Sequence, residues 1–243
     1  MIHYAIHSNP NVIVPAKMLE DAQLELGIGF DLWCEDKISS DKPHWAFDNY
    51  RLGGAIGYEC SKLLYTQPSW GKFFADKMGQ ENVKCITYAV DENVYPEVKA
   101  EKIYDIGFIG NLSDGDGRED LFNSLKDKYK VLVSTDTPTN GIAGEYAKCK
   151  IILNPIRYEE INIRFFEALA CGAQIASYSP ALHLFAEEGK HYLTYKTKDE
   201  LHDKIEYLLK NPDIAETMRV EARKEVLRRH TYKHRVKEIA NFI

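Results

Sequence analysis

Residues 154–172 read NPIRYEEINIRFFEALACG, the most informative segment of the chain. Its second half predicts a helix over residues 163–171 that ends at Gly172, a residue type that often follows the last turn of a helix. Short apolar runs at residues 151–154 and 174–177 predict a strand on either side of that helix. A strand, a helix and a second strand in this order are typical of a parallel sheet covered by helices.

The same alternation of apolar runs and amphipathic stretches extends in both directions along the chain. A polar segment with a proline, residues 91–97, interrupts it and indicates a connection between two units. We therefore predict an α/β protein with an N-terminal domain over residues 1–92 and a C-terminal domain over residues 93–243. Each half fits a small doubly wound sheet, in which ligands bind beyond the carboxyl ends of the strands. The last helix, within residues 231–243, is expected to pack back across the N-terminal domain.

Two charged residues lie inside the helix over residues 163–171, which is apolar around nearly its whole circumference. Arg164 and Glu167 are three residues apart and therefore share one face. Buried charges are costly unless they pair or bind a ligand, so two hypotheses stay open. The two side chains could form a structural ion pair. Alternatively, Glu167 could accept hydrogen bonds from a ribose diol while Arg164 and the free N–H groups near Asn162 meet phosphate.

The acids Glu159 and Glu167 are separated by seven residues, and residues 166–172 read FEALACG. This pattern resembles the E-x7-E element and the following helix of group-1 retaining glycosyltransferases. It is especially similar to the CgeB-like branch, whose members often show an Asn-x-Arg-x-Phe-Glu arrangement. Residues 162–167 of this chain read NIRFFE.

Other segments agree with this family in order and spacing. Residues 88–96 resemble the inter-domain segment, residues 104–111 the first strand and glycine turn of the donor domain, and residues 230–235 the closing helix. The resemblance covers about residues 85–243, whereas residues 1–84 match only as a shortened N-terminal half. It implies the GT-B architecture of two Rossmann-like domains, with the donor site in the C-terminal one.

The resemblance also implies roles for individual residues. Glu167 would contact the donor ribose, Glu159 would approach the transferred sugar, and Arg164 would bind donor phosphate, with Asn162 at the start of the same helix. The family usually has a glycine-rich stretch after the first acid, whereas residues 160–162 of this chain read EIN. A solvated loop acid is therefore the alternative role for Glu159.

The turn after the first strand of the C-terminal domain adds Gly110, Asn111 and Arg118 to the donor-binding candidates. Glycine lets the backbone approach a ligand closely, and Arg118, which opens a helix, could bind diphosphate. GT-B enzymes generally need no metal between carboxylates, so cationic side chains and helix N-termini are expected to stabilise the leaving diphosphate. The E-x7-E resemblance further implies retention at the anomeric carbon, by attack on the face from which the diphosphate departs and without a separate enzyme nucleophile.

The acceptor side offers one catalytic candidate, His7. A strand is predicted over residues 4–7, which would place His7 at the ligand end of the N-terminal sheet. There it could act as a base or contact the acceptor, and a structural role for a lone histidine is the alternative.

Composition narrows the functional classes. The 31 basic and 37 acidic residues give a net charge of −6, which argues mildly against nucleic acid as a partner. The chain begins without the pattern of a signal peptide, and no apolar run approaches the ~20 residues that span a bilayer. The five cysteines are scattered without C-x-x-C spacing, which indicates reduced thiols in a cytoplasmic protein and no zinc site.

We therefore expect a cytoplasmic, metal-independent hexosyl- or pentosyltransferase, monomeric or homodimeric, that uses a nucleoside-diphosphate sugar as co-substrate and no other cofactor. The acceptor could be a glycan, a small metabolite or a modified DNA base. A non-catalytic nucleotide-sugar-binding or scaffold protein of the same fold is the alternative, and it would bind the donor without turnover. A sugar-nucleotide epimerase would release product without an acceptor.

Overall fold

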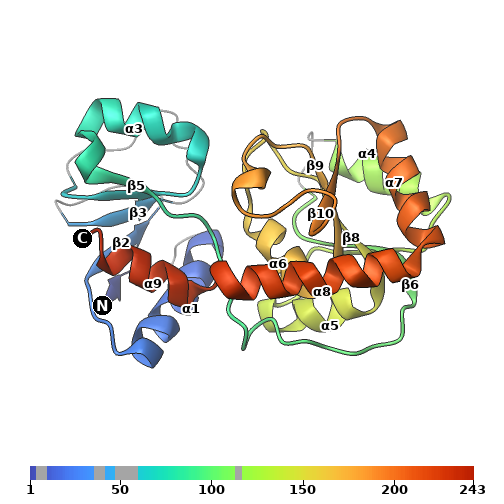
Figure 1. Cartoon of the computed structure of the whole chain (residues 1–243), viewed down its shortest axis with the longest axis horizontal. Coiled ribbons are helices and arrows are strands. Elements are labelled where there is room, and N and C mark those ends of the chain that lie inside the picture. The colour runs from blue at the N-terminus through green and yellow to red at the C-terminus, as the bar shows by residue number, and fades with distance from the viewer. Residues whose placement is uncertain (4–9, 36–41, 47–59, 113–116) are drawn as a thin grey trace. The chain divides into compact units, whose positions relative to one another are not determined.

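The computed structural model describes residues 1–3, 10–35, 42–46, 60–112 and 117–243. It divides the chain into an N-terminal unit, residues 1–89 with 230–243, and a C-terminal unit, residues 90–229 (Figure 1). The expected boundary between residues 92 and 93 thus lies three residues later than the observed one. A second boundary follows Arg229, and the last helix belongs to the N-terminal unit.

The N-terminal unit is built around parallel strands whose spatial order follows the chain. The strands are β1 Ile2–His3, β2 Leu32–Glu35, β3 His44–Ala46, β4 Leu63–Tyr65 and β5 Val83–Cys85. The helices are α1 Pro10–Leu26, α3 Gly71–Met78 and α9 Tyr232–Ala240. The strand order does not reverse among the described strands of this unit, so they contain no switch point of the kind expected for a doubly wound sheet. The strand expected over residues 4–7, with His7, lies outside the described residues.

One buried arginine fastens α9 to the strand region of the N-terminal unit. Arg235 is 3% exposed, and its Nε donates to the Thr87 carbonyl at 3.0 Å. Its Nη2 donates to the Tyr88 carbonyl at 3.2 Å, and its Nη1 contacts Glu238 at 3.2 Å. Arg235 therefore holds the end of the chain against the segment that follows β5.

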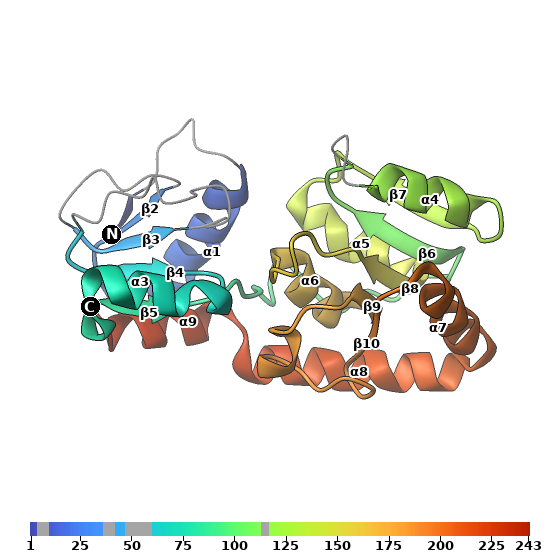
Figure 2. The same ribbon diagram turned by 90° about the horizontal axis from the view of Figure 1, so that it is seen from above.

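The C-terminal unit contains a parallel sheet in the order β10-β9-β8-β6-β7. Its strands are β6 Tyr104–Ile109, β7 Val131–Ser134, β8 Cys149–Asn154, β9 Ala173–Ser177 and β10 Tyr192–Tyr195. Its helices are α4 Arg118–Lys126, α5 Ile142–Ala147, α6 Ile163–Cys171, α7 Lys198–Lys210 and α8 Pro212–Arg229. Helices α4 and α7 cover one face of the sheet, and α5 and α6 cover the other (Figures 1 and 2).

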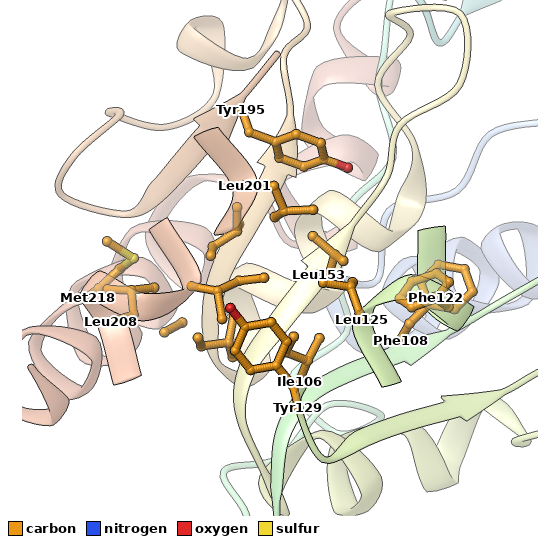
Figure 3. Close-up of a cluster of buried hydrophobic side chains, with 14 residues drawn as sticks. Ile106, Phe108, Phe122, Leu125, Tyr129, Leu153, Tyr195, Leu201, Leu208 and Met218 are labelled. Carbon is orange, nitrogen blue, oxygen red and sulfur yellow. The ribbon is translucent and has the colours of Figure 1, made fainter. Parts of the chain in front are cut away.

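The central strands of this sheet are nearly continuous apolar runs because helices bury both of their faces. The core between the sheet and helices α4, α7 and α8 is drawn in Figure 3 and includes Ile106, Phe108, Phe122, Leu125, Leu153, Leu201, Leu208 and Met218. Burial of each such side chain contributes roughly 1.5–3 kcal/mol. This packing fixes the strands whose carboxyl ends carry the polar residues described next.

Candidate functional site

The carboxyl ends of β6 and β8 meet where the strand order of the C-terminal sheet reverses. The chain passes from β6 to its outer neighbour β7, and from β8 in the opposite direction to β9. Gly110 follows β6, whereas Asn154 ends β8 and Pro155 follows it. Ligands of open α/β sheets bind at such a switch point, so the site begins here.

Arg118, the first residue of α4, ties the two strand ends together. Its Nη1 donates to the Asn111 carbonyl at 3.1 Å, and its Nη2 donates to the Pro155 carbonyl at 2.6 Å. The side chain is 7% exposed. The predicted diphosphate contact is therefore already bonded to backbone on both sides of the switch point. Asn111 supplies only a backbone carbonyl to this arrangement, and its side chain is exposed.

Arg164, in the first turn of α6, lies directly against Gly110. Its Nε donates to the Ile109 carbonyl at 2.6 Å, and its guanidinium lies 4.6 Å from the centre of the Phe108 ring. A Cβ at Gly110 would sit 1.7 Å from the Arg164 Nη2, and the φ of +147° at this glycine disfavours any other residue. Among the described residues, no carboxylate forms an ion pair with Arg164. Its Nη groups therefore remain available to an anion.

Asn162 caps α6 instead of presenting its side chain as a ligand contact. Its Oδ1 accepts a hydrogen bond from the Phe165 N–H at 3.0 Å. The amides of Asn162 and Asn154 also bond each other, at 3.1 and 3.2 Å. This pairing places the N-terminus of α6, with its positive dipole end, at the end of β8.

Glu167 lies one turn further along α6 and is 7% exposed. Its Oε1 accepts a hydrogen bond from the Tyr95 hydroxyl at 2.6 Å. Burial raises the pKa of this carboxyl, whereas the Tyr95 hydrogen bond and the charge of Arg164 oppose the rise. Arg164 and Glu167 share a face but form no direct ion pair, because each is bonded to a different partner. The hypothesis of a structural pair is thus not supported.

The loop before α6 bends sharply without a glycine. Tyr158 and Glu159 have φ values of 54° and 56°, a left-handed conformation that costs a non-glycine residue on the order of 1–3 kcal/mol. The Ser179 hydroxyl donates to the Glu159 carbonyl and so holds this turn. The Glu159 side chain is exposed, as is Tyr158. Loops held in strained conformations are frequent at functional sites.

A pocket of about 420 Å³ opens at the carboxyl ends of these strands, within the ~300–1,000 Å³ range of ligand sites. It is lined by Gly117, Arg118, Leu121, Pro155, Ile156, Arg157, Tyr158, Ser177 and Tyr195. Burial raises the pKa of Tyr195 to about 12, so its hydroxyl is a neutral donor at physiological pH. Tyr195, Ser177, Arg157 and Tyr95 are not among the site residues predicted from the sequence. The strand that ends at Tyr195 was itself not predicted.

The structure also bears on metal binding, on the cysteines and on membrane-spanning helices. No group of three or more metal-binding side chains occurs among the described residues. The cysteines are all free thiols. None of the described helices is long and apolar enough to cross a membrane.

Solved structures of low sequence identity share the fold. HepE of Anabaena, in complex with UDP and glucose, is 14% identical with a TM-score of 0.66, and the match covers 98% of this chain and 83% of HepE. Sucrose-phosphate synthase of Thermosynechococcus elongatus is 14% identical with a TM-score of 0.60, and the match covers 98% and 79%. TarM of S. aureus is 13% identical with a TM-score of 0.60, and the match covers 82% and 50%. This chain thus spans half the length of TarM.

A search of curated protein sequences finds no match. A family model described as glycosyl transferase-like matches residues 101–241, more than half of the chain. The matched region contains the whole C-terminal sheet, the switch point and α9. The chain therefore belongs to the glycosyl transferase-like family, and its fold is GT-B, with two Rossmann-like units of which the N-terminal one is shortened.

Proposed function

We propose that this chain is a glycosyltransferase that moves a sugar from a nucleoside-diphosphate sugar to an acceptor hydroxyl, with the donor held at the carboxyl end of the C-terminal sheet. Family membership supports the reaction class. One observation carries the donor assignment: Arg164 is fixed through Nε at the switch point, while no carboxylate among the described residues pairs with it. A guanidinium in that state suits a diphosphate, which it can bind through two parallel hydrogen bonds.

The remaining donor contacts follow from the same geometry. The N-terminus of α6 and the backbone at Gly110 would face the diphosphate, because glycine permits close approach there. Glu167 would accept a hydrogen bond from a hydroxyl of the donor ribose. Arg118 would act indirectly, by holding the loops after β6 and β8 at a fixed distance. Uridine nucleotides are the first to test, since HepE has been crystallised with UDP and with UDP-glucose.

The proposed chemistry depends on the negative charge that develops on the leaving diphosphate. As the bond from the anomeric carbon to the diphosphate breaks, negative charge grows on the leaving oxygens, and Arg164 with the α6 N–H groups would stabilise it. Glu159 is exposed beside the pocket, where it would lie near the transferred sugar. We propose retention at the anomeric carbon, without a metal or a cofactor. The NIRFFE motif supports placement in the CgeB-like branch.

The acceptor is proposed as a class only. The net charge of −6 favours a glycan or a small hydroxylated metabolite over a DNA base. His7 remains a prediction for the acceptor-side base.

The test begins with thermal-shift measurements on metal-free protein against UDP, GDP, ADP, CMP and their common sugar conjugates. A ligand of the folded state raises its stability with the logarithm of ligand concentration over Kd, so one nucleotide family should raise Tm. Mass spectrometry of reactions with candidate acceptors then detects transfer, and NMR of the product reports its anomeric configuration.

Three outcomes separate the hypotheses. A shift followed by transfer with retained configuration supports the proposal. A rise in Tm with neither sugar transfer nor slow donor hydrolysis favours a nucleotide-sugar-binding protein without catalysis. The absence of a shift with every nucleotide, on well-folded protein at millimolar ligand, contradicts the donor site itself.

A further inference from the structure

A buried tyrosine outside the sheet, Tyr95, forms a hydrogen bond with Glu167. Tyr95 precedes β6 in the C-terminal unit, is 0% exposed, and donates its hydroxyl proton to the Glu167 Oε1 at 2.6 Å. A hydrogen bond to a charged acceptor is among the stronger contacts in proteins, and removal from water strengthens it.

The backbone of Tyr95 also forms hydrogen bonds within the C-terminal unit. The Nη1 of Arg223, on α8, donates to the Tyr95 carbonyl at 3.0 Å and to the Ala170 carbonyl of α6 at 2.7 Å. The Tyr95 N–H bonds the Asp91 carbonyl at 2.9 Å. Tyr95 is therefore fixed relative to α6 at both ends, and it can hold the Glu167 carboxylate in one orientation.

The second oxygen of Glu167 has a different environment. Among the described residues, no protein group donates to Oε2, and Oε2 is not one of the fully buried atoms that lack a partner. Oε2 thus keeps contact with solvent, while Oε1 is held by Tyr95. One carboxylate presents a fixed oxygen to the protein and an open one to a ligand.

We propose that Tyr95 is a positioning residue, which holds Oε1 of Glu167 so that Oε2 is aimed at a hydroxyl of the donor ribose. This inference rests on the proposed function, because the ligand is the donor nucleotide. A phenylalanine at this position would fill nearly the same volume but could not donate the hydrogen bond. The hydroxyl therefore contributes orientation that packing alone does not supply.

The pH dependence of nucleotide binding distinguishes a positioning role of Tyr95 from a purely structural one, because it reports the protonation of Glu167. Burial raises the pKa of Glu167, and the Tyr95 bond opposes that rise. Other ionisable groups near the carboxyl are Arg164 and Cys171 on α6, Tyr146 on α5, and Arg223 on α8. Loss of the Tyr95 hydroxyl leaves those groups in place and raises the pKa further. Binding that needs the carboxylate is then lost at a higher pH.

The experiment compares Tyr95→Phe with Tyr129→Phe by calorimetric titration of UDP between about pH 5 and pH 8. Tyr129 is a matched control, since its hydroxyl donates to Glu206 at 3.1 Å at the opposite end of the same sheet. We expect Tyr95→Phe to bind UDP about tenfold more weakly at neutral pH, with its acid midpoint displaced upward. Tyr129→Phe should bind like the wild type.

A double-mutant cycle keeps the inference testable if Tyr95→Phe also lowers stability. In the Glu167→Gln background, Tyr95→Phe should weaken UDP binding little further, because the oriented carboxylate is already gone. Additive losses would overturn the inference, as would equal affinity and pH midpoint for Tyr95→Phe and the wild type. If the wild type binds no nucleotide, the proposed function fails, and this inference with it.

Discussion

Charged side chains at the two ends of the C-terminal sheet have different kinds of partner. At the amino end, Lys150 pairs with Asp105 at 2.8 Å, near solvent. At the carboxyl end, Arg118 and Arg164 are bonded to backbone carbonyls, and Glu167 is bonded to a tyrosine. Lys150 and Asp105 at the amino end pair with each other, whereas among the described residues no carboxylate forms an ion pair with Arg164 at the carboxyl end. In the proposed function, the diphosphate of the donor supplies the negative charge that Arg164 binds.

A tyrosine–glutamate hydrogen bond occurs at each end of the sheet, and the pKa values of the two carboxyls differ in direction. Glu206, at the amino end, accepts hydrogen bonds from Lys128, Lys210 and Tyr129, which lower its pKa to about 2. Glu167, at the carboxyl end, has Tyr95 as its one hydrogen-bond partner in the described part of the chain, and burial raises its pKa. The same pair of residue types therefore stabilises a carboxylate at one end and leaves it under-compensated at the other.

Loss of Arg164 should have the largest effect on this contrast. Arg164→Ala removes the guanidinium that we assign to the diphosphate, and we expect about a 100-fold loss in nucleotide affinity, or ~2.7 kcal/mol. Calorimetric titration with UDP measures it. Lys150→Ala, a cation removed from the amino end, is the control and should bind UDP like the wild type. Equal losses in both variants would remove the distinction between the two ends.

Gly110→Ala should have the second-largest effect on nucleotide binding. The new methyl group would overlap the Arg164 guanidinium, and the φ of +147° disfavours alanine at this position. We expect a stability loss of about 2 kcal/mol, together with weaker UDP binding because Arg164 must move. Thermal unfolding with and without UDP separates the two effects. Unchanged affinity in a destabilised variant would show that the position of Arg164 does not matter for the ligand.

Glu167→Gln should weaken UDP binding about tenfold while leaving the fold intact. Because the folded-state pKa of Glu167 lies above its unfolded value, its favourable contribution is complete below about pH 4.5 and is lost as the pH rises through the folded pKa. At neutral pH the glutamine variant should therefore be at least as stable as the wild type. Thermal melts across pH check this sign. A marked destabilisation at neutral pH would revive a structural role for the carboxylate.

The smallest effect is expected at the amino end. Glu206→Gln removes a carboxylate whose pKa is lowered to about 2, so its stabilisation is present above about pH 4.5 and fades as the pH falls toward 2. We expect a slight decrease in Tm at neutral pH that disappears in acid, and no change in UDP affinity. A change in affinity would mean that the amino end also takes part in binding.

The sequence predicts the elements whose pattern is local. The helix over residues 163–171 has the observed bounds, because the Asn162 cap and Gly172 mark its ends. The short strands β3 and β10 were not predicted. β10 shows buried residues only at its two ends, Tyr192 and Tyr195, so no strand periodicity is visible there.

The site is predictable only as far as its residues are neighbours in the chain. Arg164 and Glu167 stand out because charges interrupt an apolar helix. Tyr95 could not be found in this way, since its partner Glu167 is 72 residues away. Arg118 is a site candidate from the sequence, but its bond to the Pro155 carbonyl, 37 residues away, depends on the order of the strands. Such partners follow from topology rather than from spacing.

Hydrogen–deuterium exchange with and without UDP compares both ends of the C-terminal sheet in one measurement and shows at which end the nucleotide binds. Bound nucleotide should protect the amides of residues 108–112 and 154–167, at the carboxyl end. Amides of residues 128–131 and 148–150, at the amino end, should exchange at unchanged rates. Protection confined to the amino end, or binding of UDP without protection at the carboxyl end, would contradict the account.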